Sequence, residues 1–173
     1  MCTANQCRSP MAEALLRRRL DERGVAARVS SAGLLLGGAP PTQPAIDTMA
    51  EAGLDISGHV SRQVTPTLIG EADLVVTMTR QHVIELTLMA PDAWPRMFQV
   101  LDLVRRAEKV GPRPPGEPPA DWLVAVGDGR TRSGLLAASL NDDVADPVGQ
   151  PTAAYHRTKE LLDDLMTRMA ALI

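Results

Sequence analysis

The chain has 173 residues, of which 45% are hydrophobic, so it is long and apolar enough to form one domain over residues 1–173. Its formal net charge of -3 argues against a nucleic-acid partner, which would need a strongly basic face. No apolar run is long enough to span a bilayer, and no basic-then-apolar leader opens the chain. We therefore expect a cytoplasmic protein without membrane insertion.

Helical and strand patterns alternate along the chain. Ser9 as N-cap and Pro10 at the first helical position begin a predicted helix that Gly24 ends. Further helices are expected over 41–53, 80–90, 120–129, 132–143 and 151–173, and strands over 26–33, 71–79 and 96–103. A Pro- and Gly-rich stretch at about 111–119 is predicted to be a surface connection. The alternation predicts an α/β fold with a parallel sheet.

The opening stretch MCTANQCRSP contains what a phosphate-hydrolysing cysteine needs. The main-chain amides of a short loop can surround phosphoryl oxygens, and the positive end of the following helix stabilises a thiolate. Arg8 can hold two phosphate oxygens with its planar guanidinium, and Ser9 can donate a hydrogen bond to the sulfur of Cys2. We predict that Cys2 is the nucleophile. The residues predicted to bind phosphate are Thr3, Ala4, Asn5, Gln6, Cys7, Arg8 and Ser9. A cysteine six positions before an arginine also occurs by chance, so this spacing alone is a weak signal. The helix start directly after it is the context that supports a phosphate-binding loop.

A hydrolase of this kind also needs a group that protonates the leaving atom and later deprotonates water. Asp146, fixed in a loop by Pro147, is the candidate, although an Asp-Pro pair is also a common structural turn. Asp142 and Asp143 are interpreted as a solvated acidic loop. The three histidines lack metal-ligand spacing, so we predict no metal and no cofactor.

With these residues in place, the chain resembles the low-molecular-weight protein tyrosine phosphatase family along nearly its whole length. The stretches that carry the resemblance are CTANQCRSPMAEA, SSAG, GHVSRQ, ADLVVTMTRQH and DPVGQPTAAY. The resemblance implies a three-layer, flavodoxin-like α/β fold with a small parallel sheet covered by helices on both faces. It implies a phosphomonoester hydrolase that forms a phosphocysteine on Cys2 and acts on a phosphorylated protein or a small phosphomonoester.

The family's roles then fall on matching positions. Cys2 matches the nucleophile, Arg8 the residue that holds the transition state, and Asp146 the acid and base. Asn5 and Ser31 match residues that support the loop through side-chain hydrogen bonds. The second loop cysteine, Cys7, matches one that can form a protective disulfide with the nucleophile.

Several positions depart from the family pattern. Ala4 stands where glycine is usual, which is a mild change if the backbone angle suits a side chain. Gln6 replaces an apolar residue of the pocket wall. Val148 and the leucines at 34–36 stand where aromatic residues are common. Because such aromatics sandwich a phosphotyrosine ring, we expect little preference for phosphotyrosine over other aryl phosphates.

Two other functions remain open. Arsenate mimics phosphate in such a loop, so the chain could be an arsenate reductase that uses a small external thiol, since it has no further cysteine in its middle. It could also be a catalytically weak, phosphate-binding regulatory protein that keeps the loop as a relic.

The family pattern also places a strand before the nucleophile, at the centre of the sheet, and Met1 alone cannot form it. We therefore expect that the first strand is missing, that Met1 is a misassigned start, and that the native chain has an apolar segment upstream. Without that strand, RVSS is expected to pair directly with DLVVTM and the loop to lose its geometry.

Overall fold

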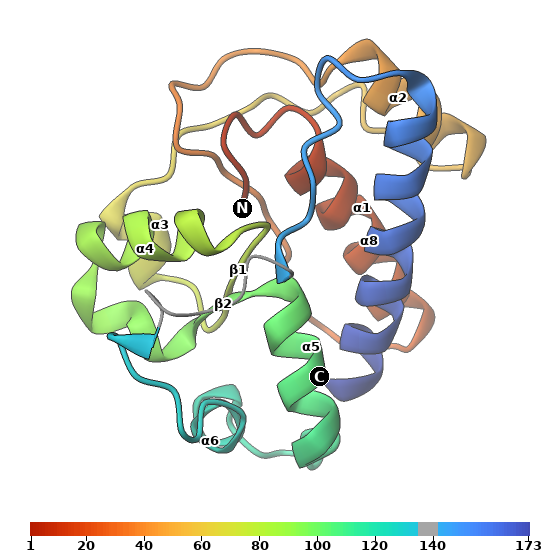
Figure 1. Ribbon diagram of the computed structural model, residues 1–173. Helices are drawn as coiled ribbons and strands as arrows, with labels where there is room; N and C mark the ends of the chain where they lie inside the picture. Colours follow the sequence, from red (N-terminus) through yellow and green to blue (C-terminus); the bar gives the residue numbers. More distant parts are fainter. Residues whose placement is uncertain (135–141) are drawn as a thin grey trace. The chain divides into compact units, whose positions relative to one another are not determined.

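The computed structural model describes residues 1–134 and 142–173 (Figure 1). The chain divides into two compact units, each described by itself below. The first unit comprises Met1–Val64 and Val144–Ala170, and the second comprises Thr65–Asp143 and Ala171–Ile173. None of the helices among the described residues is long and apolar enough to cross a membrane.

Three helices build the first unit: α1 (Arg8–Glu22), α2 (Gln43–Glu51) and α8 (Thr152–Leu172), whose last residues belong to the second unit. Met11 and Leu15 of α1 are fully buried, because residues four apart lie on the same face of a helix. Arg19 of α1 donates to Asp163 of α8 over 2.8 Å, and Figure 1 draws the two helices near each other. The predicted closing helix is therefore present and packs with the helix after the loop.

Helix α1 begins two residues earlier than predicted. The helix begins at Arg8 with Cys7 as N-cap, and no side chain caps it. Ser9 is not the N-cap because it is the second residue of the helix, and its hydroxyl binds Asn5 and Cys2. The predicted end is correct, since Gly24 follows the helix with a φ of 68° and donates to the Asp21 carbonyl.

The strand expected over 26–33 is wrong, because only Gly33 takes part in any β-bridge there. Gly33 forms isolated parallel bridges with Cys2 and with Gln63. A strand exists through hydrogen bonds to a neighbour, and residues 28–31 have no strand neighbour among the described residues. The expected pairing of RVSS with DLVVTM is likewise not formed, since Val75–Thr77 pairs with Met97–Gln99 instead.

A small parallel sheet lies in the second unit, which confirms the α/β class. Strand β1 (Val75–Thr77) pairs with β2 (Met97–Gln99) in the register Val75 to Met97, and helices α4 (Arg80–Met89) and α5 (Val100–Val110) contact both strands. The other elements are α3 (Pro66–Gly70), the 3-10 helix η1 (Pro91–Arg96) and α6 (Pro119–Val126).

Both strands are shorter than predicted. The one expected over 96–103 ends at Gln99, because Val100, Leu103, Val104 and Ala107 form a buried face with helical spacing instead. The helices expected over 80–90 and 120–129 are present as α4 and α6. Most of the one expected over 132–143 lies outside the described residues.

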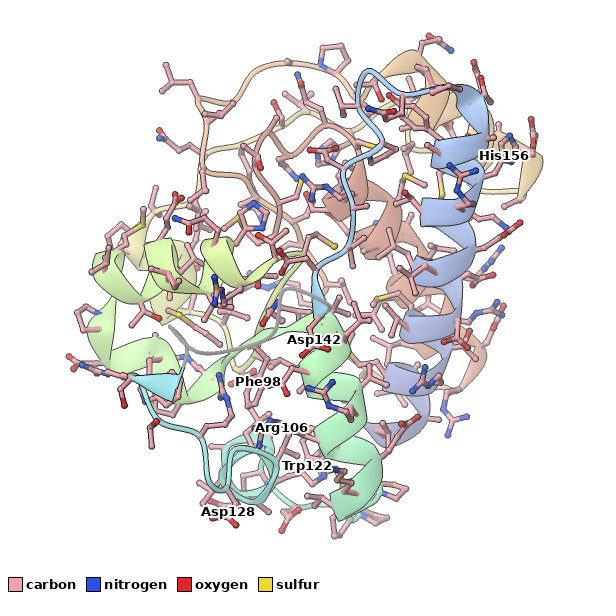
Figure 2. The ribbon with its side chains drawn as sticks, in the orientation of Figure 1. Phe98, Arg106, Trp122, Asp128, Asp142 and His156 are labelled. Carbon is pink, nitrogen blue, oxygen red and sulfur yellow. The ribbon has the colours of Figure 1, made fainter. Side chains whose placement is uncertain are left out.

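Charged side chains of α5 have acidic partners, and Figure 2 labels Arg106 of this helix and Asp142, which lies outside it. Arg105 donates to both oxygens of Asp142, and these hydrogen bonds raise the pKa of the Arg105 guanidinium. Asp143 accepts from the Arg80 main chain and from Gln99, each over 2.7 Å. The two aspartates are therefore bound within the second unit and do not form the solvated acidic loop that was expected.

The aromatic residues of the second unit have polar partners (Figure 2). Trp122 donates its ring N–H to the Gly111 carbonyl, which lies in the connection between α5 and α6. The Arg130 guanidinium lies 3.7 Å from the centroid of the Phe98 ring. Burial lowers the pKa of Arg130 to about 10.

Candidate active site

The segment from Cys2 to Arg8 folds as a loop, and three of its carbonyls are bound by residues outside it. The Thr3 carbonyl accepts from Leu34 at 2.7 Å, and the Gln6 carbonyl accepts from Thr42 at 2.9 Å. The Asn5 carbonyl lies 3.0 Å from Nε2 of His59. Because C=O and the next N–H of a planar trans peptide point in opposite directions, the amides after these carbonyls face the inside of the loop. Amides that face inward in such a loop can bind an anion.

Cys2 lies at the start of this loop with 3% of its surface exposed. Its sulfur is 3.0 Å from the hydroxyl of Ser9, in the first turn of α1. An O–H donor at this distance stabilises a thiolate, which is the reactive form of a cysteine. The fold therefore places a hydrogen-bond donor on the predicted nucleophile.

Asn5 holds the loop together with every polar atom of its side chain. Its Nδ2 donates to Ser9 at 2.9 Å and to Ser31 at 2.8 Å, and its Oδ1 accepts from the Arg62 main chain at 2.9 Å. Asn5 has a φ of 57° and is the only non-glycine residue in the described part of the chain with a positive φ. Asparagine tolerates this left-handed conformation better than most residues. Ala4 therefore does not need the freedom of glycine, and its substitution is mild.

Arg8 is buried at the first position of α1, with 5% of its side chain exposed. One terminal nitrogen donates to the Val144 carbonyl at 3.0 Å, and the other pairs with a carboxylate oxygen of Asp146. Its Nε has no hydrogen-bond partner among the described residues. A buried N–H without a partner is costly, so Arg8 has an unused donor for an anion.

Asp146 lies in the loop before α8 and is 45% exposed on its side chain. Its Oδ1 accepts from the main-chain N–H of Val148 at 3.2 Å, so the carboxylate is held by its own turn. The other oxygen binds Arg8. Asp146, which lies far from Cys2 and Arg8 in the sequence, thus joins their loop within the first unit.

Cys7 has a different environment from Cys2, and both cysteines are free thiols. Burial raises the pKa of Cys7 to about 12, with smaller contributions from the charges of Asp146 and Cys2. Its sulfur contacts the sulfur of Met11 at 3.8 Å. Cys7 is therefore a protonated thiol at neutral pH, packed behind the loop.

A model of the low molecular weight phosphotyrosine protein phosphatases matches residues 1–111. The protein-arginine-phosphatase of Bacillus subtilis (strain 168) is 40% identical over 176 residues, which cover 98% of this chain and 91% of that protein. The chain belongs to this phosphatase family.

Other members match over part of their length, or are solved structures with a similar fold. Wzb of Escherichia coli (strain K12), a low molecular weight protein-tyrosine-phosphatase, is 44% identical over 95 residues, and the match spans 60% of its length and 53% of this chain. A mutant of YwlE arginine phosphatase with a phosphorylated active-site serine has a TM-score of 0.74 at 26% identity, covering 98% of this chain and 90% of that one. The tyrosine phosphatase of T. tengcongensis has a TM-score of 0.73 at 26% identity, covering 97% and 92%.

The positions where this family member lacks aromatic residues are open to solvent. Leu36 is 83% exposed, Leu35 is 55% exposed and Val148 is 51% exposed. Tyr155 is the one aromatic residue in the described part of the first unit, and it is buried. At the positions where other family members have aromatic residues, this chain therefore presents exposed aliphatic side chains.

His59 binds the Asn5 carbonyl, in keeping with a structural histidine beside the loop. Three other groups that touch the loop or its supports were not predicted from the sequence. The carboxylate of Glu13 binds Ser31, and the Val144 carbonyl binds Arg8. Gly33 lies so close to the loop that a Cβ there would be 2.7 Å from the Thr3 carbonyl oxygen. The motifs GHVSRQ and SSAG contain two of these residues, but their contacts depend on chain segments brought together by folding.

Proposed function

We propose that this chain is a protein phosphatase that hydrolyses its substrate through a phosphocysteine on Cys2. One observation carries the proposal: Cys2 with its donor Ser9, and Arg8 with Asp146, meet at a loop whose amides face inward. These are the nucleophile, the anion-binding groups and the acid that such a reaction needs.

In the first step the Cys2 thiolate attacks phosphorus, and the bond from phosphorus to the leaving atom breaks. Asp146, in its protonated form, gives its proton to that atom. The loop amides and Arg8 hold the phosphoryl oxygens, and the unpartnered Nε of Arg8 is available for one of them. Arg8 also binds Asp146, so an incoming phosphate competes with that carboxylate for the guanidinium.

In the second step a water molecule attacks the phosphocysteine. The Asp146 carboxylate takes a proton from the water, the sulfur–phosphorus bond breaks, and inorganic phosphate leaves. Cys2 departs as a thiolate, which the Ser9 hydroxyl stabilises by its hydrogen bond of 3.0 Å. Each cycle consumes one water molecule and restores Cys2, so no cofactor takes part.

We infer phosphoarginine, rather than phosphotyrosine, as the side chain that this phosphatase acts on. The exposed Leu35, Leu36 and Val148 offer no aromatic face to a phenol ring, whereas they suit the aliphatic stem of an arginine. One relative that matches over nearly the whole chain is named a protein-arginine-phosphatase. Gln6, which is partly exposed, adds a polar acceptor for guanidinium N–H groups.

Two peptides of identical sequence, one with phosphoarginine and one with phosphotyrosine, test this choice. We expect kcat/KM to be at least about tenfold higher for the phosphoarginine peptide, with Cys2→Ser inactive on both, because a difference of one aromatic contact is worth about that factor. A preference for phosphotyrosine would contradict the substrate assignment. If the protein hydrolyses neither peptide but reduces arsenate in the presence of a small thiol, its activity is that of an arsenate reductase and not of a phosphatase.

A further inference from the structure

A continuous line of hydrogen bonds runs from α1 to the nucleophile. Glu13 Oε2 accepts from the Ser31 hydroxyl at 2.6 Å, and the Ser31 oxygen accepts from Asn5 Nδ2 at 2.8 Å. The second hydrogen of that nitrogen goes to the Ser9 oxygen at 2.9 Å, and Ser9 lies 3.0 Å from the Cys2 sulfur. Four consecutive contacts of 2.6 to 3.0 Å therefore connect a carboxylate to the thiol.

The donated hydrogens in this line point away from Asn5 on both sides, toward Glu13 at one end and toward Cys2 at the other. An ionised carboxylate can only accept, so Ser31 must donate its single proton to Glu13. The Ser31 oxygen then faces Asn5 with a lone pair and receives Nδ2. Because Asn5 donates to Ser9, the Ser9 hydroxyl keeps its own proton for the Cys2 sulfur.

The two oxygens of Glu13 have separate partners. Oε2 binds Ser31, and Oε1 binds the guanidinium of Arg17 at 2.5 Å, one helical turn away. Arg17 also donates to the Val29 carbonyl, close in sequence to Ser31. The Glu13 side chain is 17% exposed. A glutamine at this position has a single acceptor oxygen, so it would leave either Ser31 or Arg17 without its acceptor.

We propose that Glu13 is a positioning residue that orients the Ser9 hydroxyl toward the Cys2 sulfur through Ser31 and Asn5. The proposal rests on the proposed function in so far as the Cys2 thiolate is the nucleophile and leaving group. Glu13 touches neither substrate nor sulfur. Its effect falls on the stability of the thiolate, and therefore on how readily phosphocysteine breaks down.

Alkylation of Cys2 by iodoacetate, followed by mass spectrometry at pH 6, measures the thiolate without any phosphatase assay. We expect Glu13→Gln to slow this alkylation about tenfold, the size of a hydrogen bond to a charged group. Glu22→Gln is the matched control, since Glu22 lies on the same helix and pairs only with Arg18 and Arg19 in the described contacts. Alkylation in that variant should proceed at the wild-type rate.

Two further variants, Ser31→Ala and Ser31→Ala combined with Glu13→Gln, show whether Glu13 acts on the Ser9 hydroxyl through these hydrogen bonds or only through the stability of the fold. Ser31→Ala should slow alkylation by a similar factor, and adding Glu13→Gln to it should cause no further loss, because the connection is already cut. A stopped-flow burst with an aryl phosphate should show phosphocysteine breaking down more slowly in Glu13→Gln than in wild type. Denaturant midpoints show whether each variant is folded.

Wild-type alkylation in a folded Glu13→Gln, or losses that add up in the double variant, would overturn the proposal. The proposed function can fail independently of it. If the wild-type protein hydrolyses no phosphorylated substrate but Glu13→Gln still slows alkylation, the positioning role stands and the phosphatase assignment fails. If hydrolysis is fast and alkylation is unaffected in Glu13→Gln, the positioning role fails alone.

Discussion

Asp146 is bound to Arg8 and to its own turn, with its side chain half exposed. Asp146→Asn removes the proposed proton donor but keeps the shape of the turn. We expect kcat/KM, which reports phosphocysteine formation, to fall by about a hundredfold or more for a poor leaving group such as an alkyl phosphate. For 4-nitrophenyl phosphate, whose leaving group needs no proton, the loss should be much smaller. Equal losses for the two substrates would remove Asp146 from the acid role.

Cys7 provides a prediction on pH dependence. Burial raises the pKa of its thiol from 9.0 to about 12, so the folded protein keeps a proton that the unfolded chain loses above pH 9. The neutral thiol therefore stabilises the fold fully below pH 9, and this contribution is lost as pH rises toward 12. Denaturant titrations of Cys7→Ala should show a shallower fall in the free energy of unfolding over this range than wild type. Parallel curves would contradict the assignment.

At the scale of elements, the loop depends on how closely another segment approaches it. Gly33 forms bridges to both Cys2 and Gln63, and a Cβ on it would lie 2.7 to 2.9 Å from backbone atoms of Thr3, Ala4 and Asn5. Such contacts force the backbone to move, and a displacement of about 1 Å in a catalytic group costs about a hundredfold in rate. We expect Gly33→Ala to lower kcat/KM for aryl phosphates by at least about that factor.

Gly58→Ala is the control for this substitution. No atom lies within 4 Å of a Cβ built on Gly58, so the added methyl group has room. Thermal unfolding and kcat/KM should stay close to wild type in Gly58→Ala. A fully active Gly33→Ala would show that the loop can move away without losing its function.

Helices could be predicted from the sequence because their signals are local. Apolar spacing and Gly24 are enough to predict α1, and the closing helix α8 follows from the same periodicity. The strand over 26–33 could not be judged in this way, because a strand depends on partners elsewhere in the chain. The prediction that Ser9 is an N-cap is wrong, because its hydroxyl binds Asn5 and Cys2 once the loop has folded, and the local sequence does not reveal these contacts.

The candidate site could be predicted in part for the same reason. Cys2, Arg8 and Ser9 lie within one short motif, and the structure brings Asp146 to them. The support of Asn5 by Ser31 followed from the family resemblance and is present as a hydrogen bond of 2.8 Å. Glu13, Gly33 and Val144 carry no signal of their own, since an acid on a helix, a glycine and a carbonyl become informative only through their neighbours.

At the scale of the whole molecule, an anion that binds the loop must stabilise the folded chain. At a phosphate concentration of one hundred times its Kd, the free energy of unfolding rises by about 2.7 kcal/mol, which corresponds to a shift of about 5 to 10 °C in Tm for a domain of this size. Arg8→Lys should lose most of the shift, because an ammonium cannot replace the planar fork. Sodium chloride at equal ionic strength is the control, and an unchanged shift in Arg8→Lys would contradict phosphate binding at this site.

Rapid acid quench of a reaction with an aryl phosphate tests directly whether the phosphoryl group passes through Cys2. Asp146→Asn is used beside wild type, because loss of the base slows phosphocysteine breakdown and lets it accumulate. Tandem mass spectrometry should find one phosphoryl group on Cys2 in a burst that precedes steady hydrolysis, and none on Cys7. Rapid hydrolysis with no phosphorylated Cys2 in either protein would contradict the mechanism.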